Sequence, residues 1–167
     1  FWASYLLAQD KDTQTKLRAE ISAFAPERAE NIDDLRNWPL LRNVLLEAMR
    51  LYPPVPHLMR GAIETEMVCG ETMPKGAQVW ISPWVLHRHR KFWQHPTAFI
   101  PQRFAGQPAP WVQMPGYIPF GAGPRICLGL HFAMAEAQIV LAHLLARFKV
   151  SLPGADEVMP NGRVTIE

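Results

Sequence analysis

The sequence has 167 residues and a formal net charge of +2, with 49% hydrophobic and 19% charged residues. This length is typical of one domain, and the apolar fraction excludes an intrinsically disordered chain. The small net charge argues against a protein that binds nucleic acid or an acidic membrane through charge. Two cysteines, Cys69 and Cys127, are too few for a disulfide scaffold.

Four stretches have apolar residues at helical spacing. They are residues 1–8, 13–24, 39–52 and 128–148. Asp10 and Asp12 are candidate caps for the second helix, and Pro53 and Pro54 end the third. The last helix is expected to bury an apolar face. That face consists of Leu130, Met134, Ala137, Leu141, Leu144 and Phe148.

Proline divides the chain, because twelve of its sixteen prolines lie between Pro53 and Pro124. An internal proline removes a backbone donor and clashes with the preceding turn, so no long helix is expected there. Two short strands are predicted at residues 63–68 and 77–81, with Cys69 buried in a strand. The expected fold class is therefore mainly α with small β elements.

The strongest functional signal is a glycine-rich loop that carries one cysteine to the start of the last helix. It reads Phe120-Gly121-Ala122-Gly123-Pro124-Arg125-Ile126-Cys127-Leu128-Gly129. A helix N-terminus stabilises a thiolate, and glycines allow a large flat group to approach the backbone. A thiolate, an aromatic residue and an arginine together suit a haem, whereas a buried cysteine beside an ordinary turn is the simpler alternative.

This loop matches the pattern F-x-x-G-x-R-x-C-x-G, and through it the chain resembles the haem-binding end of the cytochrome P450 family. The resemblance implies a C-terminal part of the P450 fold and a haem b cofactor, iron protoporphyrin IX with a cysteine thiolate as axial ligand. Cys127 would be that iron ligand, with Phe120 against the haem and sulfur. Arg125 would pair with a propionate, and Gly123 and Gly129 would belong to the same cofactor-binding set.

Glu47 and Arg50 place a carboxylate and a guanidinium one turn apart on one helix. Taken alone, the pair could be an ordinary exposed helix pair. The resemblance implies instead that both form a buried structural triad with Arg103, which holds the long loop before the cysteine. Gln102 departs from the family, which usually has an acid there, so this loop is expected to be less tightly held.

The loop after the Glu47 helix carries further candidates. By the resemblance, Val55, His57 and Leu58 would line a substrate pocket, and Arg60 would meet a propionate. For His57, a packed or solvated loop histidine is the simpler interpretation. A role for His57 as a second iron ligand is not expected, because it would compete with oxygen.

The run from His87 to Lys91 is locally basic. Its simplest interpretation is a solvated face. The alternative is part of a docking surface for an acidic electron-transfer partner, since the family uses positive charge on the cysteine side of the haem. His87, His89 and Cys69 lack a standard zinc spacing, so no zinc site is predicted.

The resemblance spans nearly the whole chain but less than half of a complete family member. We therefore expect one partial P450 domain over residues 1–167, with the N-terminal portion and its acid–alcohol pair absent. The implied activity is a haem-thiolate monooxygenase that inserts one oxygen atom from O2 into a small organic, apolar substrate. The electron donor would be a ferredoxin or a flavoprotein reductase, and no nucleic acid is involved.

Two alternatives to a monooxygenase stay open at this stage. One is a haem-thiolate peroxygenase or isomerase, which would share the cysteine motif. The other is a truncated, non-catalytic remnant that binds haem, and the isolated chain is expected to be inactive in any case. Polar residues interrupt the longest apolar stretch, residues 132–148, so no transmembrane anchor is predicted, and a cytoplasmic location is favoured.

Overall fold

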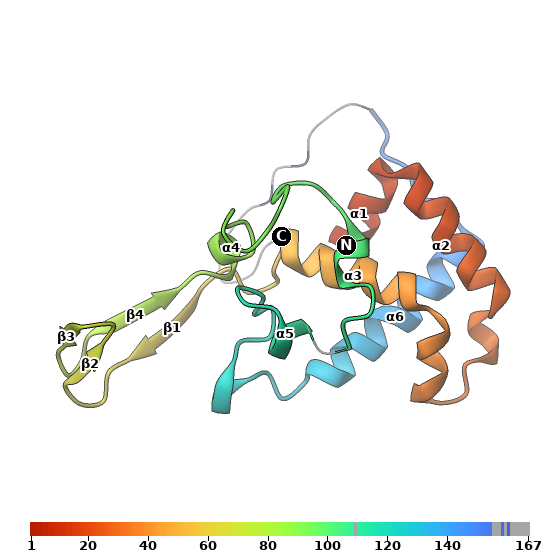
Figure 1. The fold of residues 1–167 in the computed structure, drawn as a ribbon. Helices are drawn as coiled ribbons and strands as arrows, with labels where there is room; N and C mark the ends of the chain where they lie inside the picture. Colours follow the sequence, from red (N-terminus) through yellow and green to blue (C-terminus); the bar gives the residue numbers. More distant parts are fainter. Residues whose placement is uncertain (109, 155–157, 159, 161–167) are drawn as a thin grey trace.

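The structure is a computed structural model that describes residues 1–108, 110–154, 158 and 160. Helices occupy both ends of this part of the chain, and two small antiparallel ribbons lie between them (Figure 1). The α-helices are α1 (Trp2–Gln9), α2 (Lys11–Ala23), α3 (Pro39–Leu51), α4 (Pro83–Leu86), α5 (Pro110–Gln113) and α6 (Leu130–Arg147). The strands are β1 (Leu58–Gly61), β2 (Glu66–Val68), β3 (Glu71–Met73) and β4 (Gln78–Ile81). Short 3-10 turns are η1 (Pro26–Arg28), η2 (Ile32–Asn37), η3 (Pro101–Phe104) and η4 (Gly123–Arg125).

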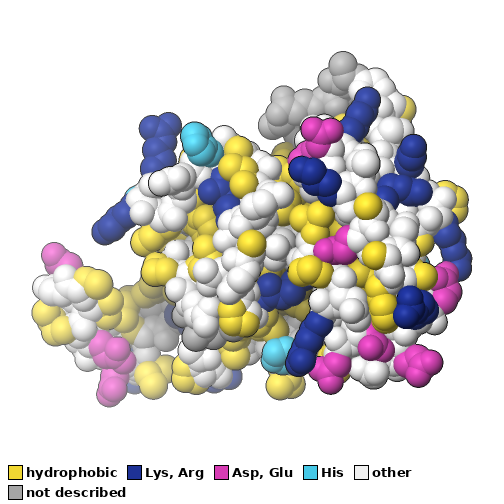
Figure 2. Space-filling model, turned by 45° about the vertical axis from the view of Figure 1, so that its right-hand side comes forward, with side chains coloured by type: hydrophobic (Ala, Val, Ile, Leu, Met, Phe, Trp, Pro, Cys, Tyr) yellow, Lys and Arg dark blue, Asp and Glu magenta, His cyan; other side chains and the backbone are white. Residues whose placement is uncertain are grey.

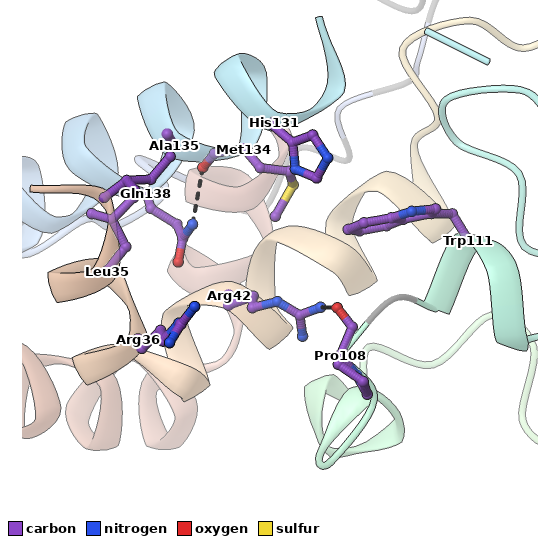
Figure 3. Close-up of a pocket in the computed structure, with 10 residues that line it drawn as sticks. Leu35, Arg36, Arg42, Pro108, Trp111, His131, Met134, Ala135 and Gln138 are labelled. Carbon is purple, nitrogen blue, oxygen red and sulfur yellow. Dashed lines mark hydrogen bonds between the residues drawn. The ribbon is translucent and has the colours of Figure 1, made fainter. Parts of the chain in front are cut away.

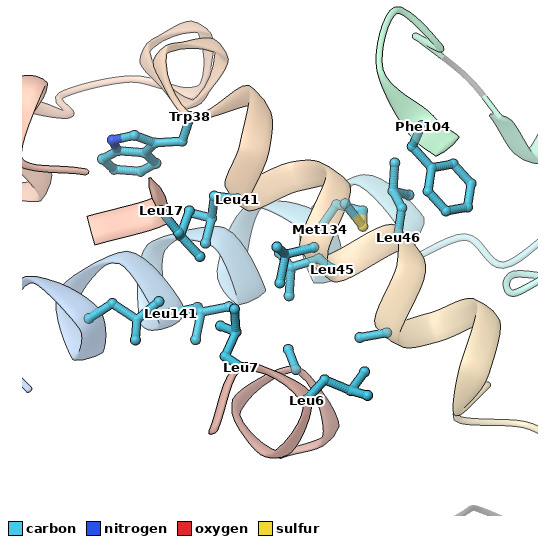
Figure 4. Close-up of a cluster of buried hydrophobic side chains, with 14 of the residues drawn as sticks. Leu6, Leu7, Leu17, Trp38, Leu41, Leu45, Leu46, Phe104, Met134 and Leu141 are labelled. Atoms are coloured by element: carbon cyan, nitrogen blue, oxygen red, sulfur yellow. The ribbon is translucent and has the colours of Figure 1, made fainter. Parts of the chain in front are cut away.

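Helix α3 is the centre of the packed body and contacts α1, α2 and α6. It confirms the predicted helix to within one residue, and proline at its first position is favourable there. Figure 4 shows the leucines of α3 between side chains of α1, α2 and α6. The labelled members of this core are Leu6, Leu7, Leu17, Trp38, Leu41, Leu45, Leu46, Phe104, Met134 and Leu141. Burial of this apolar surface is the main force that holds the helices together.

The boundaries of α2 follow from its cap. The Asp10 carboxylate accepts a hydrogen bond from the backbone N–H of Thr13 at 2.9 Å, which satisfies one of the free donors of the first turn. Asp12 lies in that first turn instead and does not cap the helix. The helix therefore begins two residues earlier than predicted.

Helix α6 begins and ends inside its predicted range, but its apolar face was predicted only in part. Leu130, Met134 and Leu141 are buried, whereas Phe148 lies beyond the helix in extended backbone and is 60% exposed. The side chains that α6 buries are Leu130, Met134, Gln138, Leu141, Ala142 and Leu145. The helix is covered by α2, α3, η1 and η2, and the direction of these contacts selects the buried side.

The middle region forms two ribbons, with β1 paired to β4 and β2 paired to β3. The predicted strand over 77–81 is confirmed as β4, but the one over 63–68 is right only for β2, and β1 and β3 were missed. Cys69 and Gly70 both have positive φ angles, 53° and 86°, which suits a tight hairpin turn. Cys69 is therefore exposed at a turn, and the prediction that it is buried in a strand is wrong.

Large hydrophobic side chains also reach the surface, and Figure 2 shows many of them between charged groups. Two of the most exposed lie beside the cysteine: Leu128 is 101% exposed and Phe132 is 74% exposed. Exposed apolar surface of this kind marks a place where another group or chain binds. The cysteine loop thus presents an apolar surface to whatever occupies this side of the molecule.

Candidate functional site

The cysteine loop is a tight structure made by backbone hydrogen bonds. The N–H of Cys127 donates to the carbonyl of Phe120 at 2.8 Å, and the N–H of Gly121 donates to the carbonyl of Ile118 at 3.1 Å. Gly121 and Gly123 have φ angles of +74° and +67°, a region that costs other residues energy. The two glycines therefore allow the chain to fold back on itself just before the cysteine.

The Cys127 side chain is exposed at the end of this loop. A Cβ atom added at Gly129 would lie 3.9 Å from the Cys127 sulfur, so a longer side chain there would crowd the thiol. A Cβ atom added at Gly121 would lie 3.9 Å from the Leu58 side chain, so β1 lies against the loop. Cys127 is thus exposed in the same stretch of chain as Leu128 and Phe132, and Gly129 leaves space beside the sulfur.

An apolar hollow of about 300 Å³ lies next to the loop. Phe120, Ala133, Met134 and Ala137 form one wall of it, and α1 and α3 form the other. Its lining contains no charged residue among those that the structure describes. A soft sulfur donor beside an apolar hollow fits a haem, because a thiolate suits iron and the ring needs an apolar surface.

Two arginines near the loop have no acidic partner among the described residues. Arg125 is exposed in η4, and its side chain makes no ion pair there. Arg60 is exposed on β1, where it donates a hydrogen bond only to the neighbouring Met59 carbonyl at 2.8 Å. Guanidinium groups without an acidic partner could each bind the carboxylate of a haem propionate.

The other predicted pocket residues precede β1 or begin it. Leu58 opens β1 opposite Ile81 and is half-buried beside Gly121. Val55 is 37% exposed and His57 is exposed, its ring 6.2 Å from that of Trp80 in an edge arrangement. Among these candidates, Leu58 lies against the cysteine loop, next to Gly121.

Glu47 is the centre of a buried charge cluster. Its carboxylate accepts from Arg50 at 2.7 and 2.9 Å, from the N–H of Ile100 at 2.9 Å and from Arg103 at 3.2 Å. The side chains of Glu47 and Arg50 are completely buried, and that of Arg103 is 13% exposed. The structure therefore brings the three predicted triad residues together, and an exposed helix pair does not describe them.

The Arg50 guanidinium extends this cluster to a distant loop. Besides its two bonds to Glu47, it donates to the carbonyls of His87, Pro96 and Ala98 at 2.8, 2.6 and 3.0 Å. These bonds use all five of its N–H donors. The helix with the ion pair thus holds the chain over residues 87–98 in place. Gln102 is exposed in η3, next to the cluster but outside it.

The basic run is a solvated face in only three of its five residues. His87 is completely buried and Arg88 is half-buried, while His89, Arg90 and Lys91 are exposed. His87 is therefore part of the packed interior, and Arg88 is partly covered, with its guanidinium 3.5 Å from the ring centroid of Trp84. Only the last three could contact a partner.

Sequence reasoning missed His87 and Tyr117 as members of the site. Tyr117 is buried and donates to the Leu46 carbonyl at 2.8 Å, and burial raises the pKa of its hydroxyl well above the usual range. Its ring is 5.2 Å from the His87 ring. The apolar neighbours of His87 were the one signal in the sequence that could have indicated its burial.

A second hollow, of about 410 Å³, has Arg36 and Arg42 in its lining and lies on the side of α6 that carries His131, four residues after the cysteine. Figure 3 shows His131 and Trp111 on one side of it and Arg42 on the other. Arg42 donates to the Pro108 carbonyl at 2.6 Å, and Arg36 lies beside it in the lining. None of the described residues that line this cationic hollow is acidic, although Arg36 forms an exposed ion pair with Asp33 at 3.0 Å. It is a surface that favours a negatively charged partner.

The fold and the loop can be compared with known proteins. The family model for Cytochrome P450 matches residues 1–166 of the chain. The chain belongs to the cytochrome P450 family. A zebra fish cytochrome P450, whose structure is described with progesterone, superposes with a TM-score of 0.87 at 30% identity over 99% of this chain and 38% of that one. The predicted fold class and family are therefore confirmed.

Two relatives show how widely this part of the P450 sequence is shared. Cytokinin hydroxylase from Arabidopsis thaliana is 36% identical over 90% of this chain and 29% of its own length. Cyclooctatin synthase from Streptomyces melanosporofaciens is 32% identical over 99% of this chain and 36% of its own. The chain spans about a third of the length of these relatives. None of the helices that the structure describes has the length and apolarity to cross a membrane.

Proposed function

We propose that this chain is the C-terminal, haem-proximal part of a cytochrome P450 monooxygenase, with Cys127 as the axial iron ligand. The observation that carries the proposal is the accessible Cys127 sulfur in a loop whose Phe120 lines an apolar hollow. A full-length protein would add the remaining two thirds of the family's length. The proposed reaction consumes O2 and two electrons, inserts one oxygen atom into a substrate and releases the other as water.

Each residue of the loop has a separate task in this proposal. Cys127 would supply the electron-rich thiolate, and Phe120 would pack against ring and sulfur. Arg125 and Arg60 would pair with the propionates, and Gly123 and Gly129 would keep the approach clear. A bound haem supplies the activation of dioxygen, and the protein sets its ligand, charge and access.

The buried charge cluster would have a structural task rather than a chemical one. Glu47, Arg50 and Arg103 connect α3 to the loops that precede the cysteine. A buried ion pair with all its hydrogen bonds made favours one arrangement of the chain, because any other arrangement leaves a charge unpaired. The cluster would therefore hold the cysteine loop in the geometry that a haem requires.

The proposed electron donor is an acidic protein, a ferredoxin or a flavoprotein reductase. The cationic hollow with Arg36, Arg42 and His131 is the described surface that fits it best, since it is close to the cysteine loop in sequence and space. Arg42 is held in place by its hydrogen bond to the Pro108 carbonyl, and an acidic side chain of the donor would pair with its guanidinium. The exposed residues His89 to Lys91 are the competing surface.

The proposed substrate is a small apolar organic molecule. Leu58 is an apolar side chain that lies against the cysteine loop, and Val55 precedes it by three residues. Val55 is on the segment between α3 and β1, and Leu58 is the first residue of β1. Their apolar character favours a hydrophobic substrate at this wall.

The experiment is the carbon monoxide difference spectrum of the reduced, haem-loaded full-length protein. We expect the strongly red-shifted Soret band of a thiolate ligand, and we expect Cys127→Ser to abolish it. Cys69→Ser is the matched control, because Cys69 is also an exposed thiol but lies at a hairpin turn. A shifted band that survives Cys127→Ser would remove Cys127 from the ligand role.

The same preparation distinguishes the reaction classes. Product formed with O2 and an electron donor supports a monooxygenase. Product formed only with peroxide indicates a peroxygenase, and a rearranged product without added oxygen indicates an isomerase. Haem binding without any of these products would leave a non-catalytic haem-binding protein.

A further inference from the structure

His87 is a buried titratable residue that the proposed chemistry does not use. Its side chain is completely buried, and its Nε2 atom accepts a hydrogen bond from the backbone N–H of Ile118 at 2.9 Å. An Nε2 atom that accepts must be unprotonated, so the neutral ring carries its proton on Nδ1. The Nδ1 atom is the one buried side-chain nitrogen or oxygen among the described residues without a hydrogen-bond partner.

This residue joins two parts of the molecule through two different groups. Its backbone carbonyl accepts from Arg50 of the buried ion pair at 2.8 Å, while its ring accepts from Ile118. The chain of bonds continues, because Ile118 accepts from Gly121 at 3.1 Å and Phe120 accepts from Cys127 at 2.8 Å. Hydrogen bonds, together with the covalent chain at His87 and between Phe120 and Gly121, thus connect the ion pair on α3 to the backbone of the cysteine.

The orientation of the His87 ring is fixed by its neighbours. The ring lies 5.2 Å from the Tyr117 ring, and the Tyr117 hydroxyl is bonded to the Leu46 carbonyl on α3 at 2.8 Å. Tyr117 also packs against Phe104, with ring centroids 4.9 Å apart. The ring therefore has little freedom to turn away from Ile118, and its acceptor atom is prepositioned.

We propose that His87 is a positioning residue that sets the cysteine loop relative to α3. It does so as a neutral acceptor for Ile118, at the start of the turn that leads to Phe120 and Cys127. A phenyl ring would fill the same space as the imidazole but leave the part-buried Ile118 N–H without its acceptor, so packing alone does not account for a histidine here. The inference rests on the proposed function only where it refers to the haem held by Cys127.

The test compares three variants of the haem-loaded full-length protein. His87→Phe keeps an aromatic ring beside Tyr117 and removes the acceptor. His87→Gln keeps an acceptor near the position of Nε2, so it is the conservative variant. His89→Phe is the matched control, because the His89 ring also accepts a backbone N–H, from Lys91 at 3.2 Å, but is exposed to water that can replace it.

Two readouts separate positioning from general damage to the fold. The first is amide hydrogen exchange over residues 117–121, which we expect to be about tenfold faster or more in His87→Phe. Exchange in α1 should stay unchanged. The second is the fraction of the reduced carbon monoxide complex with the thiolate Soret band, which we expect to fall in His87→Phe. Both readouts should be near wild type in His87→Gln and His89→Phe.

Each outcome decides the proposal. Wild-type exchange over 117–121 in His87→Phe would overturn it, and so would a His87→Gln variant as impaired as His87→Phe. If His87→Phe does not fold, the result for His87→Gln decides alone. If the wild-type protein shows no thiolate band, the proposed function fails, and the exchange measurement still tests His87.

Discussion

The guanidinium of Arg88 lies 3.5 Å from the ring centroid of Trp84 and stacks on it. Trp84 is in α4, and Arg88 follows that helix, four residues later. The same guanidinium donates to the carbonyl of Leu51, the last residue of α3, and faces the Tyr52 ring at 5.8 Å. The carbonyls at a helix end lack partners within the helix, and a cation there is favourable. Arg88 therefore closes α3 and fixes α4 against it.

The first prediction concerns this contact. Arg88→Ala should lower the free energy of unfolding by about 1–2 kcal/mol, because it removes a desolvated cation–π contact and a helix-end hydrogen bond. Arg90→Ala is the control, since Arg90 is exposed two residues later, and its effect should be within about 0.5 kcal/mol. Denaturant unfolding of the full-length protein measures both. Equal effects would mean that the stacking contributes nothing.

The second prediction concerns the buried ion pair. Glu47→Gln should destabilise the protein by about 3–5 kcal/mol, because it leaves the completely buried Arg50 charge without its acid. Haem content after purification should fall with it. Asp33→Asn is the matched control, since its pair with Arg36 at 3.0 Å is exposed and should be worth less than about 1 kcal/mol. Normal haem content in Glu47→Gln would contradict the structural task given to the cluster.

The third prediction concerns the loss of folding stability at low pH. Burial lowers the pKa of His87 to about 4, although the backbone groups of Arg50 and Met49 act to raise it. The charges of Arg50 and Arg88 add to the lowering, and Tyr117 packs on the ring. The unfolded chain, with an ordinary pKa near 6.5, binds this proton more tightly, so the stability contributed by His87 is complete above pH 6.5. It is lost as the pH falls from about 6.5 to about 4, by about 3 kcal/mol in total.

Denaturant midpoints measured between pH 4 and pH 7.5 test this expectation. The wild-type midpoint should fall more steeply with acid than that of His87→Gln, in which residue 87 cannot titrate. The comparison cancels the acidic residues that both proteins share. Parallel curves would show that His87 is not the group responsible.

The fourth prediction concerns the turn before the cysteine. Gly121→Ala should cost about 1–2 kcal/mol, because alanine is strained at a φ of +74°. The thiolate band should weaken, since this turn places Phe120 and Cys127. Gly61→Ala is the control, because a Cβ atom there would meet nothing within 4 Å and its φ is not positive. An unchanged spectrum in Gly121→Ala would show that the turn tolerates other conformations.

The fifth prediction concerns the electron donor. Arg42→Glu should slow reduction by an acidic donor protein about tenfold or more at low salt, and the difference should shrink as salt is added. Reduction by dithionite should be unaffected. Arg90→Glu tests the competing surface in the same assay, and a larger effect there would move the docking site to the exposed residues after His87.

Sequence patterns predicted those features that depend on neighbours along the chain. The helix of Glu47 and the cysteine loop were both predictable, because helical spacing and glycine turns are local signals. The short strands β1 and β3 were not, since strands of three or four residues carry little periodicity. The reversal at Cys69 and Gly70 depended on a backbone conformation that a cysteine seldom adopts, so composition could not indicate it.

The sequence by itself determined the family, the glycine-rich turn that carries Cys127 and the one-turn spacing of Glu47 and Arg50, since each depends on a short pattern. Only the tertiary structure decided what the basic run does. His87 and Arg88 are residue types that are common on a solvated face. In the folded protein, however, the His87 ring packs near Tyr117 and the Arg88 guanidinium stacks on Trp84. Whether a polar side chain is solvated or buried depends on contacts between segments far apart in sequence, such as Arg50 with the His87 carbonyl. Those contacts exist only once the chain has packed.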